Sequence, residues 1–477
     1  MTQPTFYWHD YETWGANPLF DRPAQFAGLR TTLDFAPVGR PLSIYAQPTP
    51  DFLPHPQAAL VTGITPQHAL NQGMCEAAFA EKIAAEMQQP ETISVGYNNL
   101  QFDDEVTRHL FYRNFIDPYA HTWQNQSSRW DLIDLVRACY ALRPEGIEWP
   151  YHEDGRVSLR LEDLTRANQI DHGRAHDALS DVHATIELAK KIQQAQPRLF
   201  QYALNLRRKQ AVAAQVNLIQ FTPLVHVSVY YGAAQGYVSV IMPLGFHPEQ
   251  PNNVIYWDLR YHPGELTNHS DEALIEHRFT RRAELAEQGL PPFAGGQFQL
   301  NKCPFIAPLN VLDAANQERW DIDLQQCEQH RQLLLEQPQL RDRILQIASY
   351  QRQYDALEDP DFMLYSGSFF SDQDRSSMNI IRATPPEQLA GLSLNFEDPR
   401  LPEMLFRYRA RNYPATLTEQ EMLRWREFCQ QRLMDPPGRM LGAEQFVQEL
   451  EAALLQHPEN PSAQRVLHDL YRYVQEL

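Results

Sequence analysis

The sequence predicts a multidomain protein that begins with an α/β domain, continues with a β-rich domain and ends in helices. The chain has 477 residues, which corresponds to about three domains at roughly 150 residues each. Strand-like and helix-like segments alternate up to about residue 196, a pattern typical of α/β folds. From Pro197 the segments are mostly uncharged, alternate in polarity and are interrupted by Gly and Pro, and helical periodicity dominates beyond about residue 355.

The first 196 residues supply the elements of the α/β domain. Strands are expected at FYWHDYET, SIYAQP and ETISVGYNN. Thr65 and Pro66 predict a helix start, because threonine accepts hydrogen bonds from first-turn amides and proline suits the first helical position. Apolar residues at helical spacing predict three further helices, within FDDEVTRHLFYRNF, RWDLIDLVRACYAL and AHDALSDVHATIELAKKIQQ.

The rest of the chain follows two other patterns. LVHVSVYYG and GYVSVIM alternate at period two and predict a β-hairpin or barrel segment, and further strands are expected at NNVIYWDLRYH and GQFQLNKCPFIAP. CEQHRQLLLEQPQLRDRILQIASYQRQY, EQFVQELEAALL and QRVLHDLYRYVQEL have apolar faces at helical spacing. We therefore expect domains over residues 1–196, 197–354 and 355–477.

Composition narrows the class of protein. Hydrophobic residues make up 43% of the chain and charged residues 21%, which allows sizeable cores and argues against disorder. Five scattered cysteines without a CxxC pair argue against a disulfide framework and a structural zinc site, and favour a reducing cytoplasm. We expect neither a secretory signal nor a membrane helix. The net charge of −19 argues against tight coating of duplex DNA but is neutral for a confined nucleic-acid site.

Five residues at three places of the α/β domain are candidates for chemistry. Asp10 and Glu12 project from one face of an aromatic strand, where charge is costly unless something binds it. Asp103 is expected where a strand turns into a helix, His176 at a loop-to-helix junction, and Asp181 about one turn into that helix. Each residue alone is also explained as a solvated acid, a helix-dipole partner or a capping histidine.

Together, four carboxylates and one histidine at strand and helix ends of one domain predict a cation site. Oxygen ligands without cysteine favour Mg²⁺ or Mn²⁺ over zinc. Two such ions about 4 Å apart assist in-line phosphoryl transfer. A neutral imidazole with an unperturbed pKa of about 6.5 suits the removal of a proton from the attacking water, which makes His176 the candidate base.

Three short motifs, HDYET, NLQFD and HDALSD, resemble those of the DEDD exonuclease superfamily, in the branch with a histidine five residues before the last aspartate. Longer stretches resemble bacterial exonuclease I, a family that degrades single-stranded DNA from its 3′ end. These stretches are DRPAQFAGLRT, VTGITPQ, GYNNLQFDDEVTRHLFYRNFIDPYA, SRWDLIDLVRACYALRPEGIEWP and SLRLEDLTRANQIDH. PLVHVS, NKCP and LFRYRARNYP extend the resemblance, more patchily, over nearly the whole chain.

The resemblance implies an α/β RNase H-like exonuclease domain, with a mixed sheet and flanking helices, followed by an SH3-like β-barrel domain and a helical C-terminal domain. Together the three would form a C-shaped clamp around one strand. The resemblance also implies two Mg²⁺ ions, replaceable by Mn²⁺, and His176 as general base. The implied metal ligands are Asp10, Glu12, Asp103 and Asp181. Glu12 and Arg160 would bind the substrate, the latter through a phosphate.

A single strand is held by basic side chains along its backbone and by aromatic faces under its bases. Such DNA contacts are expected at Arg108, Tyr119, Trp123, Arg137, Arg174, Lys209, Asn301 and Lys302. Tyr112 and Arg113 lie in the same region and have the same types of side chain. Tyr112 and Trp123 could instead belong to the core, and Arg113 to a solvated helix face. Near the C-terminus, FRYRARNYP has a similar composition, and helix packing explains it equally well.

The resemblance further implies that the protein binds the acidic C-terminal tail of single-stranded DNA-binding protein, with Arg143, Tyr202 and Arg341 as candidates. We therefore expect a monomeric, Mg²⁺-dependent 3′→5′ exodeoxyribonuclease that releases 5′-mononucleotides during DNA repair and recombination in the bacterial cytoplasm. One alternative is an exoribonuclease of the same branch, which the long extension beyond residue 196 disfavours. The other is a non-catalytic strand-binding scaffold for repair, which the intact set of four acids and His176 disfavours.

Overall fold

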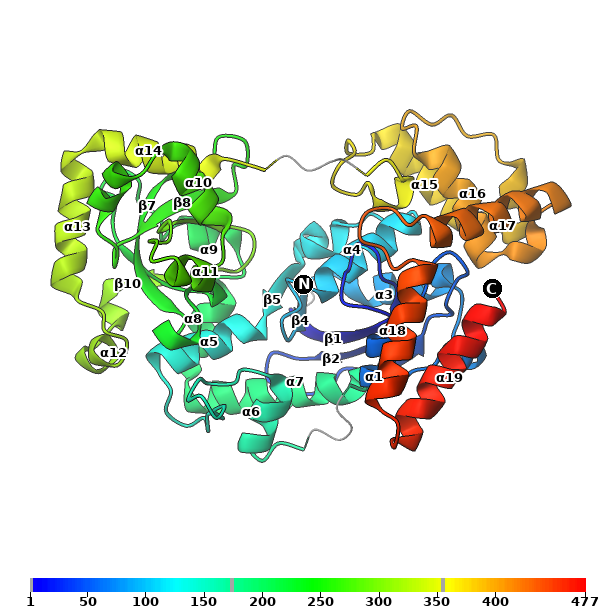
Figure 1. The fold of residues 1–477 in the computed structure, drawn as a ribbon, viewed down its shortest axis with the longest axis horizontal. Coiled ribbons are helices and arrows are strands. Elements are labelled where there is room, and N and C mark those ends of the chain that lie inside the picture. The colour runs from blue at the N-terminus through cyan, green and yellow to red at the C-terminus, as the bar shows by residue number, and fades with distance from the viewer. Residues whose placement is uncertain (1–2, 172–175, 353–356) are drawn as a thin grey trace. The chain divides into compact units, whose positions relative to one another are not determined.

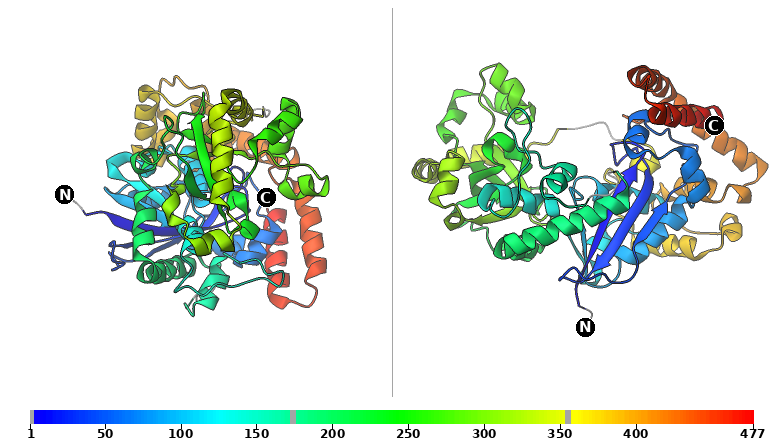
Figure 2. Two further views of the ribbon diagram at one scale, coloured as in Figure 1. Left: turned by 90° about the vertical axis from the view of Figure 1, so that its left-hand side faces the viewer. Right: turned by 90° about the horizontal axis from the view of Figure 1, so that it is seen from below.

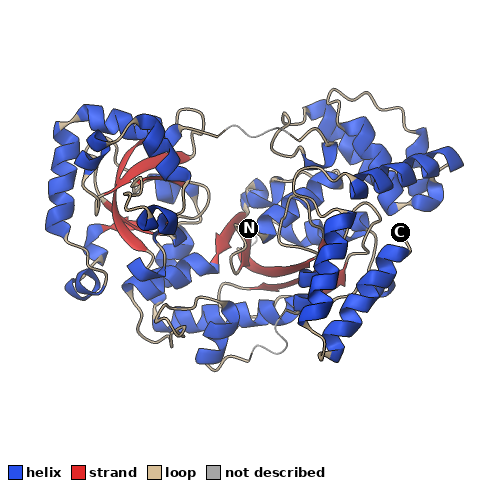
Figure 3. Cartoon of the chain, viewed as in Figure 1, coloured by secondary structure: helices blue, strands red, loops and turns tan. Residues whose placement is uncertain are grey.

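The computed structural model describes residues 3–171, 176–352 and 357–477 (Figure 1). The chain forms two compact units. The first combines Met1–Arg129, His172–Ile186 and Asp355–Leu477, and the second combines Trp130–Asp171 and Glu187–Tyr354. The strands form two five-stranded sheets (Figure 3). The division into domains at residues 196/197 and 354/355 stays a prediction.

The first sheet has the order β3-β2-β1-β4-β5 and is mixed, as predicted. Its central strand β1 pairs with β2 in antiparallel and with β4 in parallel orientation. The strands are β1 (Thr5–Thr13), β2 (Pro23–Thr31), β3 (Leu42–Tyr45), β4 (Thr92–Gly96) and β5 (Ser128–Asp131). β2 and β5 were not predicted. β5 lies at the start of a stretch expected to be wholly helical, in which the helix begins only at Leu132, with Asp131 as its N-cap.

The first unit also contains helices from the N-terminal and the C-terminal parts of the chain. Those of its N-terminal part are α1 (Pro56–Thr62), α2 (Pro66–Gln72), α3 (Glu76–Met87), α4 (Asp103–Arg113) and α7 (Ala178–Ala195), the last of which continues beyond the unit. Those of its C-terminal part are α15 (Asp372–Ala383), α16 (Leu401–Asn412), α17 (Glu419–Met434), α18 (Ala443–Gln456) and α19 (Pro461–Gln475). Thr65 caps α2 as predicted, because its side chain accepts from the His68 N–H. Helices α18 and α19 lie side by side (Figure 2) and pack on α1.

One face of the first sheet packs on α3 and α4. Tyr7, Tyr11 and Phe26 of the strands share a buried cluster with Phe79 of α3 and Leu110 of α4. This cluster contains the β1 residues that alternate with Asp10 and Glu12. The aromatic run around the two acids is therefore the core strand that fixes their direction.

A buried network of ion pairs joins the N-terminal and C-terminal parts of the first unit. The Asp51 carboxylate is fully buried and accepts hydrogen bonds from Arg22, Arg411 and Arg432 at 2.9–3.0 Å. Arg411 and Arg432 also bond the buried Asp361. Although burial opposes ionisation, these arginines hold the pKa values of Asp51 and Asp361 below the usual range.

This network includes Arg411 from the stretch FRYRARNYP. In the same stretch, Arg407 pairs with Asp361 and Arg409 pairs with Glu421, and all three arginines are buried. The packing interpretation of this stretch is thereby confirmed. The Arg113 guanidinium is likewise buried and pairs with Glu76, so the solvated-face interpretation of Arg113 is wrong.

The second sheet has the order β10-β6-β7-β8-β9, with neighbouring strands antiparallel. Its strands are β6 (Leu224–Val227), β7 (Val238–Phe246), β8 (Asn253–Asp258), β9 (Gly295–Gln299) and β10 (Phe305–Pro308). β6 and β7 pair as the alternating pattern predicts. The helices of the second unit are α5 (Leu132–Leu142), α6 (Leu161–Ala167), α8 (Pro197–Asn205), α9 (Lys209–Ala213), α10 (Asp271–Phe279), α11 (Arg282–Glu287), α12 (Ala314–Arg319), α13 (Leu324–Glu336) and α14 (Pro338–Ser349).

Pro338 separates α13 from α14, because proline cannot continue a helix hydrogen-bond ladder. Short 3₁₀ helices occur at Ala120–Thr122, Gln124–Gln126, Val229–Tyr231, Ala233–Gln235, Pro263–Asn268, Leu309–Val311, Pro360–Phe362, Pro386–Gly391 and Pro414–Thr416. Within the described ranges, every helix is too short or too polar to span a bilayer.

Candidate active site

The structure brings the predicted acids together around β1. Burial, followed by the charges of Asp103, Asp181 and Glu12, raises the pKa of Asp10 well above its usual range. Burial, followed by the charges of Asp181 and Asp177, raises the pKa of Glu12 to about 8. Such shifts arise when several carboxylates share a poorly solvated space. Besides burial, the charges that raise these pKa values come mainly from the other predicted acids, so the four carboxylates lie near one another.

Asp103 is the first residue of α4, and its side chain contacts β1 directly. The Tyr11 N–H, between Asp10 and Glu12 in sequence, donates to Asp103 Oδ1 at 3.1 Å. The parallel pairing of β1 with β4 ends at Trp8, which leaves the Tyr11 N–H available for this bond. A second hydrogen bond joins α4 to β1, because the Thr107 hydroxyl donates to the Tyr11 hydroxyl at 3.0 Å. α4 is thus fastened to β1 at the position of its acidic residue.

Asp104, the next residue of α4, forms a buried ion pair. Its side chain is 2% exposed, and Oδ2 accepts from Arg129 Nη1 of β5 at 2.7 Å. Its N–H donates to the Asn99 carbonyl at 2.9 Å. Despite burial, the charge of Arg129 lowers the pKa of Asp104. This ion pair anchors the first turn of α4 behind Asp103.

His176 and Asp181 approach Glu12 from the segment that leads into α7. One ligand atom from each of these three residues lies within 4.8 Å of those of the other two. Asp181 lies in the first turn of α7, as predicted. His176 has φ 59°, in the left-handed region that residues other than glycine rarely adopt. Strain of this kind is concentrated at functional positions.

Gln25 of β2 also belongs to this site, although it was not a predicted site residue. It is 2% exposed and lies opposite Glu12 in the β1–β2 register. Its Oε1 accepts from the Ala178 N–H at 3.4 Å, at the start of α7. Gln25 therefore links the strand of Glu12 to the helix of Asp181. Its signal in the sequence is a lone amide in the otherwise apolar stretch PAQFAG.

Predicted DNA contacts in the first unit lie around Tyr119. Arg108 is 7% exposed, donates to Glu105 at 2.7 Å and lies 5.4 Å from the Tyr119 ring centroid. Trp123 is 63% exposed, so the core interpretation of Trp123 is wrong. Tyr112 is buried, which confirms the core interpretation there.

Two exposed aromatic residues beside Tyr119 were missed. Phe369 is 81% exposed and its ring centroid lies 6.0 Å from that of Tyr119. Tyr365 is 57% exposed, and its hydroxyl accepts from Arg108 Nη1 at 3.1 Å. The signal in the sequence is the aromatic cluster in LYSGSFF. Residues from the N-terminal and C-terminal parts of the first unit thus come together. We define Tyr119, Tyr365 and Phe369 as the aromatic surface.

The remaining predicted substrate and DNA contacts lie mainly in the second unit. Arg160 is exposed at the N-cap of α6, and Lys209 is exposed at the first residue of α9. Asn301 is exposed and Lys302 half-buried between β9 and β10. Arg137 is buried and pairs with Asp134 at 2.6 Å. Arg174 lies outside the described residues.

The three candidates for binding an acidic tail also lie in the second unit. Arg143 is 37% exposed and lies 3.6 Å from Asp313. The Tyr202 hydroxyl donates to the Ile306 carbonyl at 2.8 Å. The Arg341 guanidinium lies 5.0 Å from the Phe221 ring centroid.

Family models match the chain in three consecutive parts. These are an exonuclease domain over residues 7–189, an exonuclease I SH3-like domain over 207–350 and an exonuclease I C-terminal domain over 358–477. Exodeoxyribonuclease I of Escherichia coli (strain K12) is 43% identical over 475 residues, which cover 100% of this chain and 98% of that protein. The chain belongs to the exonuclease I family.

Two further comparisons agree with this assignment. Exodeoxyribonuclease I of Haemophilus influenzae is 43% identical over 469 residues, 98% of each chain. The zinc-bound form of the E. coli ExoI–ssDNA complex matches with a TM-score of 0.93 at 43% identity, over 100% of this chain and 99% of that one. The fold expected for an exonuclease I is confirmed, with an exonuclease domain on a mixed sheet, an SH3-like domain and a helical C-terminal domain.

The residues of this site fit divalent cations. The donor set consists of carboxylate oxygens, with the His176 imidazole beside them, and oxygen donors suit hard cations. Asp10 and Glu12 have raised pKa values because burial, and then the charges of neighbouring carboxylates, oppose their ionisation. A cation reverses this situation, because it favours the ionised form of every carboxylate around it.

Proposed function

We propose that the protein is a 3′→5′ exodeoxyribonuclease that degrades single-stranded DNA to 5′-mononucleotides, as a monomer in the bacterial cytoplasm, during DNA repair and recombination. The observation that carries this proposal is the convergence on β1 of Asp10, Glu12, Asp103, Asp181 and His176. The full-length similarity to exodeoxyribonucleases supports it. The same similarity disfavours the two alternatives, an exoribonuclease and a non-catalytic scaffold.

The proposed division of roles follows the chemistry of each side chain. Asp10, Glu12, Asp103 and Asp181 hold two Mg²⁺ ions, for which Mn²⁺ substitutes. When bound by these carboxylates, the ions would supply the positive charge that offsets the scissile phosphate and the leaving oxygen. His176 accepts the proton of the attacking water through a neutral imidazole nitrogen. Arg160 binds a substrate phosphate through its fork of N–H donors, and Glu12 also contacts the substrate.

The proposed strand contacts combine stacking with positive charge. Trp123, Tyr365 and Phe369 offer exposed rings, and Tyr119 a half-buried one, on which bases stack, a contact that tolerates any sequence. Lys209, Asn301 and Lys302 bind the backbone. Arg108 and Arg137 are buried and ion-paired, so we assign them the support of neighbouring strand contacts. Arg174 remains a proposed contact from the sequence.

Purified protein mixed with 5′-labelled single-stranded DNA, RNA or duplex DNA tests the activity. With Mg²⁺ we expect a descending ladder from single-stranded DNA alone, and with chelator no product. Denaturing gel electrophoresis resolves the ladder. Equal digestion of RNA would establish the exoribonuclease instead, and activity that survives the chelator would overturn the metal-dependent mechanism.

The variant His176→Ala tests the proposed base. We expect turnover to fall by about 10²–10⁴-fold, the usual contribution of a positioned acid or base, with Mn²⁺ and DNA affinities retained. Single-turnover kinetics together with calorimetric Mn²⁺ titration measure both effects. His183→Ala, on the exposed side of α7, is the matched control. Turnover equal to the parent protein would exclude His176 as the base.

We also propose that Arg143, Tyr202 and Arg341 bind the acidic C-terminal tail of single-stranded DNA-binding protein. Removing a hydrogen bond to a charged group costs about 1.5–3 kcal/mol, so the double variant Arg143→Ala, Arg341→Ala is expected to weaken tail binding by more than about tenfold. Fluorescence anisotropy of a labelled tail peptide measures this. Arg281→Ala, at an 87% exposed position, is the control. Undiminished binding by the double variant would remove this assignment.

A further inference from the structure

Residues 363–370, here named the aromatic loop, present two rings outward and two side chains inward. Tyr365 and Phe369 are the exposed pair. Leu364 is buried in a hydrophobic cluster, and the Phe370 ring stacks on that of Tyr112 at 5.9 Å between centroids. The exposed rings therefore depend on how the loop backbone is held.

One side chain, that of Arg400, holds both ends of the aromatic loop. Nη1 donates to the Met363 carbonyl at 2.8 Å, and Nη2 donates to the Ser368 carbonyl at 2.6 Å. The guanidinium carbon lies 4.7 Å from the Phe370 ring centroid. The Asp398 carboxylate orients the guanidinium through bonds of 2.9 and 2.6 Å. Arg400 acts as a staple across the loop.

Gly367 allows this close approach. A Cβ atom at this position would lie 2.0 Å from Arg400 Nη1 and 2.3 Å from its guanidinium carbon. No larger residue fits without displacing the guanidinium from the two carbonyls. The Gly367 N–H also donates to the Met363 carbonyl at 3.1 Å, which closes the loop on itself. Arg400 and Gly367 thus form one fitted contact.

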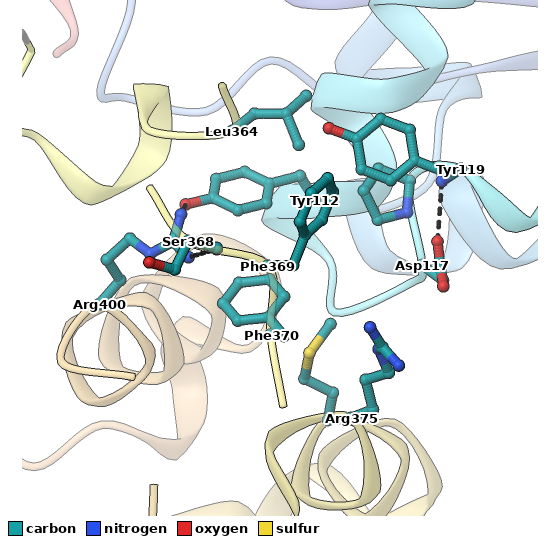
Figure 4. A pocket seen from close by; sticks show the side chains of 11 residues that line it. Tyr112, Asp117, Tyr119, Leu364, Ser368, Phe369, Phe370, Arg375 and Arg400 are labelled. Atoms are coloured by element: carbon teal, nitrogen blue, oxygen red, sulfur yellow. Dashed lines mark hydrogen bonds between the residues drawn. The ribbon is translucent and has the colours of Figure 1, made fainter. Parts of the chain in front are cut away.

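A small pocket lies beside the loop (Figure 4). Tyr112, Tyr119, Phe369 and Phe370 line it together with Arg400. Arg400 is 6% exposed, and Asp398 neutralises its charge. Its donors point to two backbone carbonyls of the loop, to Asp398 and to the Tyr112 hydroxyl, so Arg400 contacts the protein itself and leaves DNA to the exposed rings.

We propose that Arg400 is a positioning residue for strand binding. By fixing the backbone of the aromatic loop, it sets Tyr365 and Phe369 beside Tyr119 so that successive bases find preformed stacking faces. Without the Arg400 contacts, the loop becomes ordered only when DNA binds. The entropy lost in that ordering makes the binding free energy less favourable. This inference rests on the proposed function, because it assigns a role in the binding of single strands.

Arg400→Gln and Gly367→Ala test the inference by two routes, since the first removes the guanidinium and the second displaces it. We expect each to raise KM for a 30-nucleotide single strand by about tenfold, the order of one lost stacking contact, with kcat unchanged. In a protein that already carries Tyr365→Ala and Phe369→Ala, either substitution is expected to raise KM little further, because the rings that Arg400 positions are already absent. Arg424→Gln, at a 57% exposed arginine that pairs with Glu403, is the control.

Anisotropy with a labelled dT oligonucleotide in chelator separates this inference from the proposed function. A parent protein that binds the oligonucleotide without hydrolysing it in Mg²⁺ would overturn the exonuclease function, and the comparison of binding affinities would still test Arg400. Parent-like affinity in folded Arg400→Gln and Gly367→Ala proteins would overturn the inference. A fall in kcat with unchanged affinity would also overturn it, because a positioning role in strand binding acts on affinity.

Discussion

Replacing Asp181 by asparagine is expected to abolish turnover on single-stranded DNA. The substitution keeps the shape of the side chain but removes one of the charges that surround Glu12 and Asp10. We expect a loss of about 10⁴-fold or more, the order observed when single members of a cooperating catalytic set are removed. Calorimetric Mn²⁺ titration is expected to show weaker binding in parallel. Steady-state hydrolysis of a labelled oligonucleotide measures the loss.

Glu187→Gln provides the matched control on the same helix. Glu187 is 51% exposed and pairs with Lys190, so its loss removes a carboxylate that faces solvent. We expect this variant to retain full turnover. If Asp181→Asn kept more than a tenth of the parent turnover, the assignment of Asp181 as a metal ligand would be wrong.

Replacing Asp51 by alanine is expected to have the largest effect on stability. The substitution leaves Arg22, Arg411 and Arg432 buried without the carboxylate that all three bond. Removing one partner from a buried ion pair typically costs about 3–5 kcal/mol. We therefore expect the free energy of unfolding of the first unit to fall by about that amount. Urea unfolding followed by circular dichroism measures it.

An exposed ion pair between the same two parts of the chain provides the control. Glu81 of α3 pairs with Arg382 of α15, and their side chains are 47% and 25% exposed. Because solvent screens such a pair, Glu81→Ala is expected to cost less than about 1 kcal/mol. A similar loss in both variants would show that burial of the Asp51 network does not set its contribution.

The effect of Asp51 on stability also depends on pH. Its pKa is lower in the folded state than the unfolded value of about 3.9, so its contribution is complete above that value and is lost as the pH falls. We expect the parent protein to lose about 1 kcal/mol more than Asp51→Ala between pH 5 and pH 3. The same pH dependence in both proteins would contradict the low pKa.

Local patterns predicted the residues of the site because their geometry is local. The two-residue spacing of Asp10 and Glu12 fixes a common face in any strand, and Asp181 is one turn into any helix that starts at Ala178. The contacts that position these residues could not be predicted in this way. Gln25 acts through the β1–β2 register, and Arg129 reaches Asp104 from a strand that was expected to be part of a helix.

Arginine-rich stretches were the most ambiguous part of the sequence. Arg411, Arg113 and Arg108 all carry the charge that DNA binding requires, yet all three are buried. Arg411 and Arg113 pair with carboxylates from other elements, and Arg108 pairs with Glu105 of its own helix. Composition does not distinguish a phosphate contact from an internal ion pair. Only the position of the partner carboxylate decides it, and that partner lies up to 360 residues away in the case of Arg411 and Asp51.

The sequence by itself determined the α/β start of the chain, the five candidate catalytic residues, the hard-ligand character of their site and the resemblance to exonuclease I. Spacing within one strand or helix turn and side-chain chemistry are sufficient for these conclusions. The tertiary structure alone decided which arginines are internal and that Tyr365 and Phe369 join Tyr119. It also decided that Arg400 staples their loop. The physical reason is that burial and pairing depend on contacts between distant segments, which local periodicity does not encode.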